Sequence, residues 1–221
     1  MSLELKKRIL TSFFLIVLLV AMYNYSFVMI ISLIIIGIIT WVEFYALISK
    51  IFLKNTLKNK FLRFSFKASS LLYLSLLIFF IIVIESNFIN LKIYFVYSLL
   101  VAIFSDIGGI VFGKFFKGKK LTKISPNKTI SGSIGSFVLP FLLIPFFHSE
   151  LIGYESTTLI MITIFISLTT QLGDLFISYL KRKAKVKHTS NILPGHGGFL
   201  DRIDGIIFAI PASYILFKVL S

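Results

Sequence analysis

Near its C-terminal end the chain reads LPGHGGFLDRIDG, a polar and glycine-rich stretch at residues 193–205 of an otherwise apolar sequence. Asp201 and Asp204 fall at a predicted helix start with a spacing that lets both carboxylates reach one point. Magnesium prefers oxygen ligands, usually one or two carboxylates together with substrate phosphates and water. Gly197 and Gly198 permit a tight turn with exposed amides. The stretch therefore predicts a site for magnesium and a nucleotide.

Two further side chains of this stretch could contact the phosphates of the nucleotide. Arg202, between the aspartates, carries a planar guanidinium suited to phosphate, and His196 could donate a hydrogen bond to it. The alternative is that Arg202 only pairs with the aspartates and that His196 is structural. Because the polar residues occur together, we expect the cluster as a whole to be functional.

A second group of polar residues follows one face of a predicted helix in QLGDLFISYLKRK. Asp174, Ser178, Lys181 and Arg182 recur at helical spacing and form a stripe leading out of the membrane. Such a stripe could bind a charged ligand. Alternatively, the two cations extend to the membrane surface and one of them pairs with the internal aspartate.

Three acids, Glu43, Asp106 and Asp174, lie inside apolar runs. A carboxylate at the bilayer centre costs about 2.5–3.5 kcal/mol on insertion scales, so each is expected to be paired or functional. Three glycines follow Asp106 within two helical turns and let another helix or a ligand approach the backbone. We expect Asp106 to face that crevice, as a further acid near the cation. The alternative is a glycine face for helix packing, with the aspartate neutralised by a lysine.

The connector KLTKISPNKTISGSIG gathers small polar residues and lysines around Pro126. Amides at a helix start, together with hydroxyls and a lysine, suit phosphate oxygens, although the same residue types also form ordinary turns and helix caps. The candidate ligands are Ser125, Asn127, Lys128 and Thr129.

The elements that must position these residues are membrane helices. Hydrophobic residues make up 57% of the 221-residue chain and charged residues 14%, against roughly 45–50% and 25% in soluble domains. Several apolar runs approach the roughly 20 residues that cross a bilayer as helix, which predicts an all-α, polytopic bundle forming one domain over residues 1–221. Cysteine is absent from the sequence, so it holds no disulfide or thiolate site.

Hydropathy predicts about seven crossings, of which the first and fifth are short. Pro140 and Pro145 lie in the fifth, so this run is expected to be tilted, broken or re-entrant. The predicted spans are 9–23, 27–48, 68–84, 93–112, 134–147, 157–180 and 203–220.

The basic residues indicate the orientation of the bundle. Of the 23 Lys and Arg, 21 fall in the segments 6–8, 50–67, 114–128 and 181–202, which the spans place on one face. By the positive-inside rule that face is cytoplasmic and the N-terminus is inside. The net charge of +14 is thus a signal of topology and of contact with anionic lipid, and not of nucleic-acid binding.

The polar segments, taken together, resemble a known family. Residues 178–182, Lys187, Ser190 and then LPGHGGFLDRID through Asp204 are similar to the signature of phosphatidate cytidylyltransferase, with matching spacing. The likeness extends over most of residues 104–210, whereas the N-terminal half matches in hydrophobic character and around Glu43. The resemblance implies transfer of a cytidylyl group from CTP to phosphatidic acid at the cytoplasmic face of a bacterial inner membrane, and leaves a homodimer open.

On this hypothesis, acids from separate helices converge at the inner leaflet to hold Mg²⁺ between two anionic substrates. Asp174, Asp201 and Asp204 are assigned to the metal, with Asp106 nearby. The phosphates are assigned to Lys128, Lys181, Arg182 and Arg202, and substrate binding further to Ser125, Asn127, Thr129, Ser178, Lys187, His196, Gly197 and Gly198.

One position departs from the family pattern, which has an aspartate after Lys187 where this chain has His188. A carboxylate is thereby replaced by an imidazole, which is mostly neutral at cytoplasmic pH. Rival functions are a related CTP-dependent lipid enzyme, such as a polyprenol kinase or an ether-lipid synthase, and a membrane transporter that needs no nucleotide.

Overall fold

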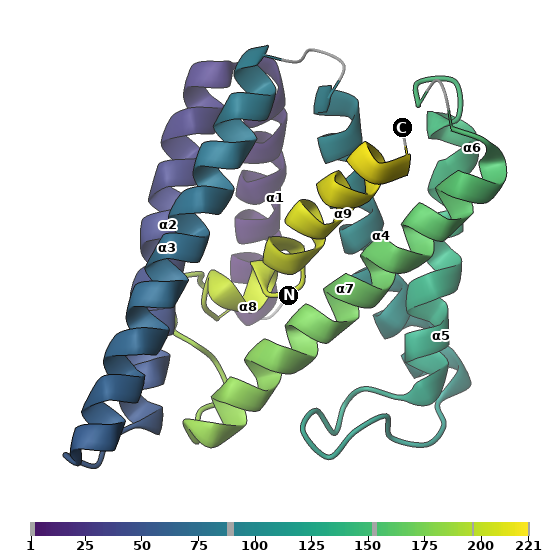
Figure 1. Ribbon diagram of the computed structural model, residues 1–221. Coiled ribbons are helices and arrows are strands. Elements are labelled where there is room, and N and C mark those ends of the chain that lie inside the picture. Colours follow the sequence, from purple (N-terminus) through teal and green to yellow (C-terminus); the bar gives the residue numbers. More distant parts are fainter. Residues whose placement is uncertain (1–2, 88–90, 152–153, 196, 221) are drawn as a thin grey trace. The chain divides into compact units, whose positions relative to one another are not determined.

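The protein is a bundle of helices, seen in a computed structural model that describes residues 3–87, 91–151, 154–195 and 197–220 (Figure 1). Regular secondary structure within these ranges is helical, which confirms the all-α prediction. The chain divides into two compact units. Unit 1 combines Met1–Asn87 with Leu180–Arg202, and unit 2 combines Phe88–Tyr179 with Ile203–Ser221. That the chain forms one domain stays a prediction.

Unit 1 contains the three N-terminal helices, α1 (Leu3–Asn24), α2 (Ser26–Ile51) and α3 (Leu57–Asn87), drawn in purple to blue in Figure 1. Their connections are short, so neighbouring helices run antiparallel. The α2 and α3 helices pack closely at Gly37, where any added side chain would overlap Ile78. The Lys67 ammonium lies 3.2 Å from the centre of the Tyr45 ring, so a cation in an apolar helix is covered by an aromatic face.

Unit 2 is built around α4 (Leu91–Phe116). It also holds α5 (Ile130–Val138), the 3₁₀ helix η1 (Leu139–Leu143), α6 (Ile144–Phe147) and α9 (Ile206–Leu220). The α7 helix (Ser156–Lys183) and the short α8 helix (Leu200–Ile203) each contribute residues to both units.

The core of unit 2 is an aromatic and aliphatic cluster that includes Tyr97, Ile162, Ile166 and Phe217. Its polar atoms are paired: Tyr97 Oη and Thr163 Oγ1 are 2.5 Å apart, and the Tyr154 hydroxyl donates to the Phe217 carbonyl at 2.6 Å. Paired hydroxyls cost little to bury, so this cluster holds α4, α7 and α9 together.

Glycines let α4 and α5 approach each other closely. A side chain at Gly108 would meet the Gly135 carbonyl carbon at 2.8 Å, and one at Gly109 would meet Ser136 Oγ at 2.7 Å. The glycines after Asp106 therefore serve helix packing, as the structural alternative predicted. Asp106 itself is exposed on α4.

Six helical segments in the described residues are long and apolar enough to cross a bilayer, which marks an integral membrane protein. About seven were predicted, and the segment outside the six is α1, whose apolar part at 9–23 is shorter than a bilayer crossing requires. The fifth predicted span, 134–147, lies within the observed segment Ile130–Phe147 and is broken as expected: η1 interrupts it at Pro140, where the amide needed for a regular α-helix is absent.

One predicted boundary is wrong. The α3 helix begins at Leu57 instead of residue 68, because the basic segment assigned to a connector consists largely of good helix formers. The last predicted span, 203–220, falls within the observed candidate span Leu200–Leu220. It is interrupted after Ile203, so that Asp201 lies on α8 and Asp204 in the turn that precedes α9.

Candidate active site

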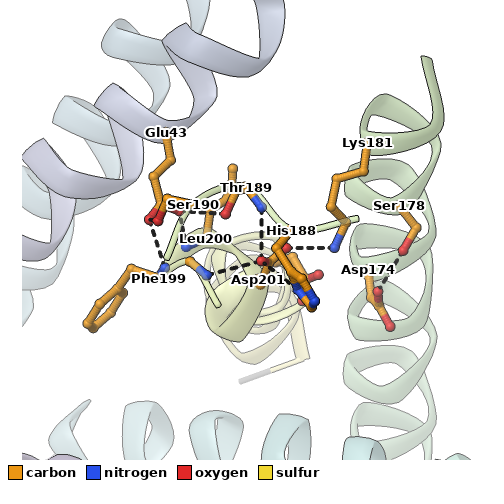
Figure 2. Close-up of polar contacts among 12 residues, drawn as sticks. Glu43, Asp174, Ser178, Lys181, His188, Thr189, Ser190, Phe199, Leu200 and Asp201 are labelled. Atoms are coloured by element: carbon orange, nitrogen blue, oxygen red, sulfur yellow. Dashed lines mark hydrogen bonds and ion pairs between the residues drawn. The ribbon is translucent and has the colours of Figure 1, made fainter. Parts of the chain in front are cut away.

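In unit 2, two predicted site residues from distant segments meet. The Lys128 ammonium and the Asp174 carboxylate form an ion pair, in which both side chains are half-buried. Ser178, one turn further along α7, donates from Oγ to Asp174 Oδ1 at 3.2 Å (Figure 2). The pair joins the polar connector to α7, and it provides a cation, a carboxylate and a hydroxyl at one place.

The connector holds Lys128 in position through its own turns. The Lys128 amide donates to the Ser125 carbonyl at 3.0 Å, which closes a turn around Pro126. Thr129 is the N-cap of α5, where its Oγ1 accepts from the Gly132 amide at 3.0 Å. Asn127 is exposed at the tip of this turn. The Ser125 carbonyl thus closes the turn, the Thr129 hydroxyl caps α5, and the Asn127 side chain stays accessible. Their assignment to substrate stays a prediction.

Asp204 reaches the same part of α7 through a close approach of two backbones. A side chain at Gly173 would come within 2.8 Å of the Asp204 carbonyl oxygen and 3.2 Å of Gly205 Cα. One at Gly205 would in turn meet the Thr170 carbonyl at 2.8 Å. The turn carrying the buried Asp204 therefore packs against α7 at the residue preceding Asp174. Within its own turn, Asp204 Oδ1 accepts from the Gly205 amide at 3.0 Å.

In unit 1, Asp201 organises the segment 184–199 between α7 and α8, which we call the signature loop. Its Oδ1 accepts from the Lys181 ammonium at 2.8 Å, and its Oδ2 accepts from the amides of Thr189 at 3.0 Å and Gly198 at 3.1 Å. His188 Nδ1 lies 3.6 Å from the same Oδ2 (Figure 2). The carboxylate is 7% exposed, so these donors replace its water.

A tight turn within the signature loop requires glycine. The amides and carbonyls of Leu193 and Gly197 exchange hydrogen bonds at 2.9 and 3.1 Å. Gly197 has a φ of +85°, and a side chain there would crowd His188 Nδ1 at 3.0 Å and Asp201 Oδ2 at 3.1 Å. The predicted tight turn is confirmed, but the exposed amides expected with it are not: the Gly197 amide donates to the Leu193 carbonyl and the Gly198 amide to Asp201 Oδ2. His196 lies outside the described residues.

Glu43, from the middle of α2, contacts the signature loop from the side opposite Asp201. Figure 2 shows its carboxylate directed at the loop. Its Oε2 accepts from Thr189 Oγ1 at 2.7 Å and its Oε1 from Ser190 Oγ at 2.5 Å. The amides of Phe199 and Leu200 donate to the two oxygens at 2.9 and 2.8 Å. Glu43 is 2% exposed, so one buried acid satisfies four donors.

Three predicted cations of unit 1 lie at its surface. Arg182 is exposed on the last turn of α7, Lys187 is exposed in the signature loop and Arg202 is exposed on α8. Side chains in such positions are accessible to an anionic ligand.

Comparison with known proteins agrees with the resemblance seen in the sequence. The sequence model of the Cytidylyltransferase family matches residues 2–220, nearly the whole chain. This chain belongs to the cytidylyltransferase family. Relatives include proteins named phosphatidate cytidylyltransferase from Rickettsia typhi, 41% identical over 138 residues, and from Bacillus subtilis, 41% identical over 130 residues. A third, from Rickettsia bellii, is 42% identical over 154 residues.

The matches to these relatives are partial. They cover 59%, 58% and 65% of this cytidylyltransferase-family chain, and 59%, 48% and 63% of the respective relatives. The matched region thus spans about half to three fifths of the length of these curated proteins.

The residues of unit 2 fit a magnesium ion by the chemistry of their donors. Asp174 and Ser178 present oxygen atoms, and Asp204 is brought to the neighbouring turn of α7 by the close approach at Gly173. No group of three His, Cys, Asp or Glu suited to a metal occurs in the part of the chain that the structure describes. Magnesium does not need one, because it usually binds one or two carboxylates plus phosphates and water.

Sequence reasoning about this cytidylyltransferase-family protein missed the role of Glu43. Its signal was present, since a carboxylate in an apolar run is expected to be paired or functional. The sequence did not reveal the partners, which lie 146 to 157 residues further along the chain. Thr189 was also missed, because nothing in its local sequence shows that it contacts two carboxylates.

Proposed function

We propose that this protein transfers the cytidylyl group of CTP to phosphatidic acid, forming CDP-diacylglycerol and pyrophosphate. The observation that carries the proposal is the Lys128–Asp174 ion pair beside Ser178. It joins the two polar segments in which a phosphate-binding cation and a metal-binding carboxylate were expected. The relatives bearing the name of this activity support the same conclusion.

The reaction needs charge neutralisation more than it needs a base. An oxygen of the phosphatidic acid phosphate attacks the α-phosphorus of CTP, and the bond from that phosphorus to the oxygen shared with the β-phosphorus breaks. The electron pair of this bond leaves with pyrophosphate. A phosphate monoester has a second pKa of about 6, so it is already an anionic nucleophile at neutral pH. The protein must therefore hold two anions together in line.

Cationic side chains supply part of that neutralisation. Lys128 in unit 2, and Lys181, Arg182 and Arg202 in unit 1, are assigned to the phosphates of the two substrates. Lysine acts as a point charge, whereas arginine can bind two phosphate oxygens at once. Asn127, at the exposed tip of its turn, and Lys187, in the signature loop, are assigned to substrate binding with them. His196, Gly197 and Gly198 keep the substrate-binding assignment made from the sequence, but the amides of the two glycines already donate to the Leu193 carbonyl and to Asp201 Oδ2 within the loop.

Magnesium is proposed as the cofactor, with Asp174 and Asp204 as protein ligands. Bound there, it would stabilise the charge that develops on the phosphates of CTP as the cytidylyl group is transferred. Lys128 neutralises Asp174 in the described structure, and a divalent cation could take over that role while Lys128 turns to phosphate. That Asp201 joins the metal site, with Asp106 nearby, remains a prediction from the sequence.

The membrane orientation follows from the basic segments. We place the N-terminus and the signature loop on the cytoplasmic side of a bacterial inner membrane, where CTP is available and where Lys and Arg are retained. The acyl chains of phosphatidic acid would enter from the bilayer between apolar helix surfaces. A homodimer stays a prediction.

The position of a radioactive label tests the proposal directly. The purified protein is incubated in detergent–lipid micelles with Mg²⁺, phosphatidic acid and CTP labelled on either the α- or the γ-phosphorus. We expect α-label in lipid and γ-label only in pyrophosphate. Label from the γ-position in lipid would instead indicate a kinase, and lipid without either label would overturn the proposal. Polyprenol and ether-linked lipid phosphate serve as alternative acceptors.

Thermal stability provides a test that needs no turnover. A ligand that binds only the folded protein raises its melting temperature. We expect CTP with Mg²⁺ to stabilise the detergent-solubilised protein more than ATP or GTP does. A transporter that needs no nucleotide would show no such preference.

A further inference from the structure

We propose that Glu43 is a positioning residue for the signature loop, acting through the loop backbone on the side chains assigned to substrate. The turnover part of this inference rests on the proposed function. Glu43 lies on α2, outside the polar segments that carry the family signature, and it is buried within unit 1.

The donors of Glu43 occur in two groups along the chain. Thr189 and Ser190 contribute hydroxyls from the first half of the signature loop, at 2.7 and 2.5 Å. Phe199 and Leu200 contribute backbone amides where the loop enters α8, at 2.9 and 2.8 Å. The carboxylate therefore ties the two ends of the glycine turn to one point on α2.

Thr189 connects Glu43 to Asp201. Its hydroxyl donates to Glu43 Oε2, while its amide donates to Asp201 Oδ2. Asp201 in turn accepts from the Lys181 ammonium at 2.8 Å. A shift of Glu43 must therefore move the loop that sets the position of Asp201, and with it the Lys181 cation assigned to phosphate.

The close approach of Glu43 also explains one glycine of the turn. A side chain at Gly198 would lie 2.6 Å from Glu43 Oε2 and 2.9 Å from the Ser190 amide nitrogen, in addition to overlapping Thr189 Oγ1. The Gly198 amide is at the same time a donor to Asp201. The turn is thus packed between two carboxylates, and there is no room for a methyl group.

The chemistry of Glu43 requires an acid and not merely a polar side chain. Its two oxygens accept four hydrogen bonds, and two of these come from amides that cannot rotate away. In Glu43→Gln one oxygen becomes an NH₂ group, which would face an amide donor and leave that buried amide without an acceptor. A buried donor without an acceptor is unfavourable, so the loop should open locally while the helices remain folded.

The test compares Glu43→Gln with Glu150→Gln, which removes the same charge from an exposed position. We expect Glu43→Gln to lower kcat for transfer of the α-label by at least about tenfold, the loss that about 1.4 kcal/mol gives. The KM for phosphatidic acid should change less than kcat, because the loop and not the lipid contact is altered. Glu150→Gln should behave as wild type. An unchanged kcat in an active preparation of Glu43→Gln would overturn the inference.

Hydrogen exchange gives a readout independent of turnover. In wild type, the amides of Phe199 and Leu200 should exchange slowly, and in Glu43→Gln they should exchange at least about tenfold faster, while peptides from α3 do not change. This measurement needs no substrate, so it can be made even if the wild-type protein shows no cytidylyl transfer. An inactive wild type would then count against the proposed function and not against the positioning role. Unchanged exchange of the two amides in Glu43→Gln would count against the positioning role.

Variants of the two hydroxyl donors extend the test and also cover the case in which Glu43→Gln fails to fold. Thr189→Ala and Ser190→Ala each remove one hydroxyl donor and keep the backbone amides. Each should lower kcat on its own, and combined with Glu43→Gln the losses should be less than additive, because the partner has already been weakened. If only the hydroxyl variants fold, their own exchange at Phe199 and Leu200 decides: an increase supports the role, and no change contradicts it.

Discussion

The ammonium of Lys128, in the turn before α5, pairs with the carboxylate of Asp174 on α7. Both were expected to be site residues, but the sequence did not predict that they would meet. The pair is half-buried, so its net contribution to stability is small, and the position of the charges is the more important consequence. It places a cation that we propose for phosphate beside a carboxylate that we propose for a metal.

Replacing Lys128 by Met should therefore impair activity more than stability. A hydrogen bond to a charged group contributes about 1.5–3 kcal/mol, so we expect CTP incorporation to fall by about tenfold to a hundredfold, with only a small change in melting temperature. Lys123→Met removes an exposed lysine from the same connector and is the matched control. Equal losses in the two variants would show that only the general positive charge of the connector matters.

Asp204→Asn separates the charge of this residue from its structural contact. Asn retains an oxygen that can accept from the Gly205 amide, as Asp204 does at 3.0 Å, so the turn before α9 should persist. Loss of a metal ligand should raise the Mg²⁺ concentration needed for half-maximal incorporation by about tenfold or more. An unchanged magnesium requirement with full activity would remove Asp204 from the metal site.

His188→Asp restores the acid that the family pattern has at this position. His188 Nδ1 lies 3.6 Å from Asp201 Oδ2, so the new carboxylate would come close to another one. Two adjacent carboxylates repel each other without a cation and attract a divalent one. We expect a lower melting temperature in EDTA, a larger stabilisation by Mg²⁺ than in wild type, and higher CTP incorporation. His188→Asn, which adds no charge, is the control. If His188→Asp responded to EDTA and Mg²⁺ as His188→Asn does, the prediction would be contradicted.

Gly173→Ala tests the close approach that brings Asp204 to α7. The added methyl group would meet the Asp204 carbonyl at 2.8 Å and Gly205 Cα at 3.2 Å, both backbone atoms that cannot turn aside. Overpacking of this kind costs about 1–3 kcal/mol, and we expect a corresponding loss of thermal stability together with lower activity. Leu172→Ala, at an exposed position one residue earlier, should leave activity intact. If Gly173→Ala had the same thermal stability and activity as Leu172→Ala, the close packing at Gly173 would not be needed for function.

The sequence by itself determined the helical membrane class and the groups of polar residues. Both are local properties: the length of an apolar run decides whether a helix can cross a bilayer, and residue types at fixed spacing decide which ligands they suit. It also predicted the tight turn around Gly197, because glycine readily adopts the positive φ that such a turn needs. The structure has a φ of +85° there. Boundaries such as the start of α3 were less well predicted, since a basic helical segment resembles a connector.

Only the tertiary structure decided which donors each carboxylate receives. Glu43 and Leu200 are separated by 157 residues, and nothing local to either one indicates the other. The glycines after Asp106 could serve a ligand or a helix, and the packing of α4 on α5 showed that they serve the helix. A buried acid needs donors wherever helix packing brings them, and that packing depends on the whole surface of each helix and not on the spacing of a motif.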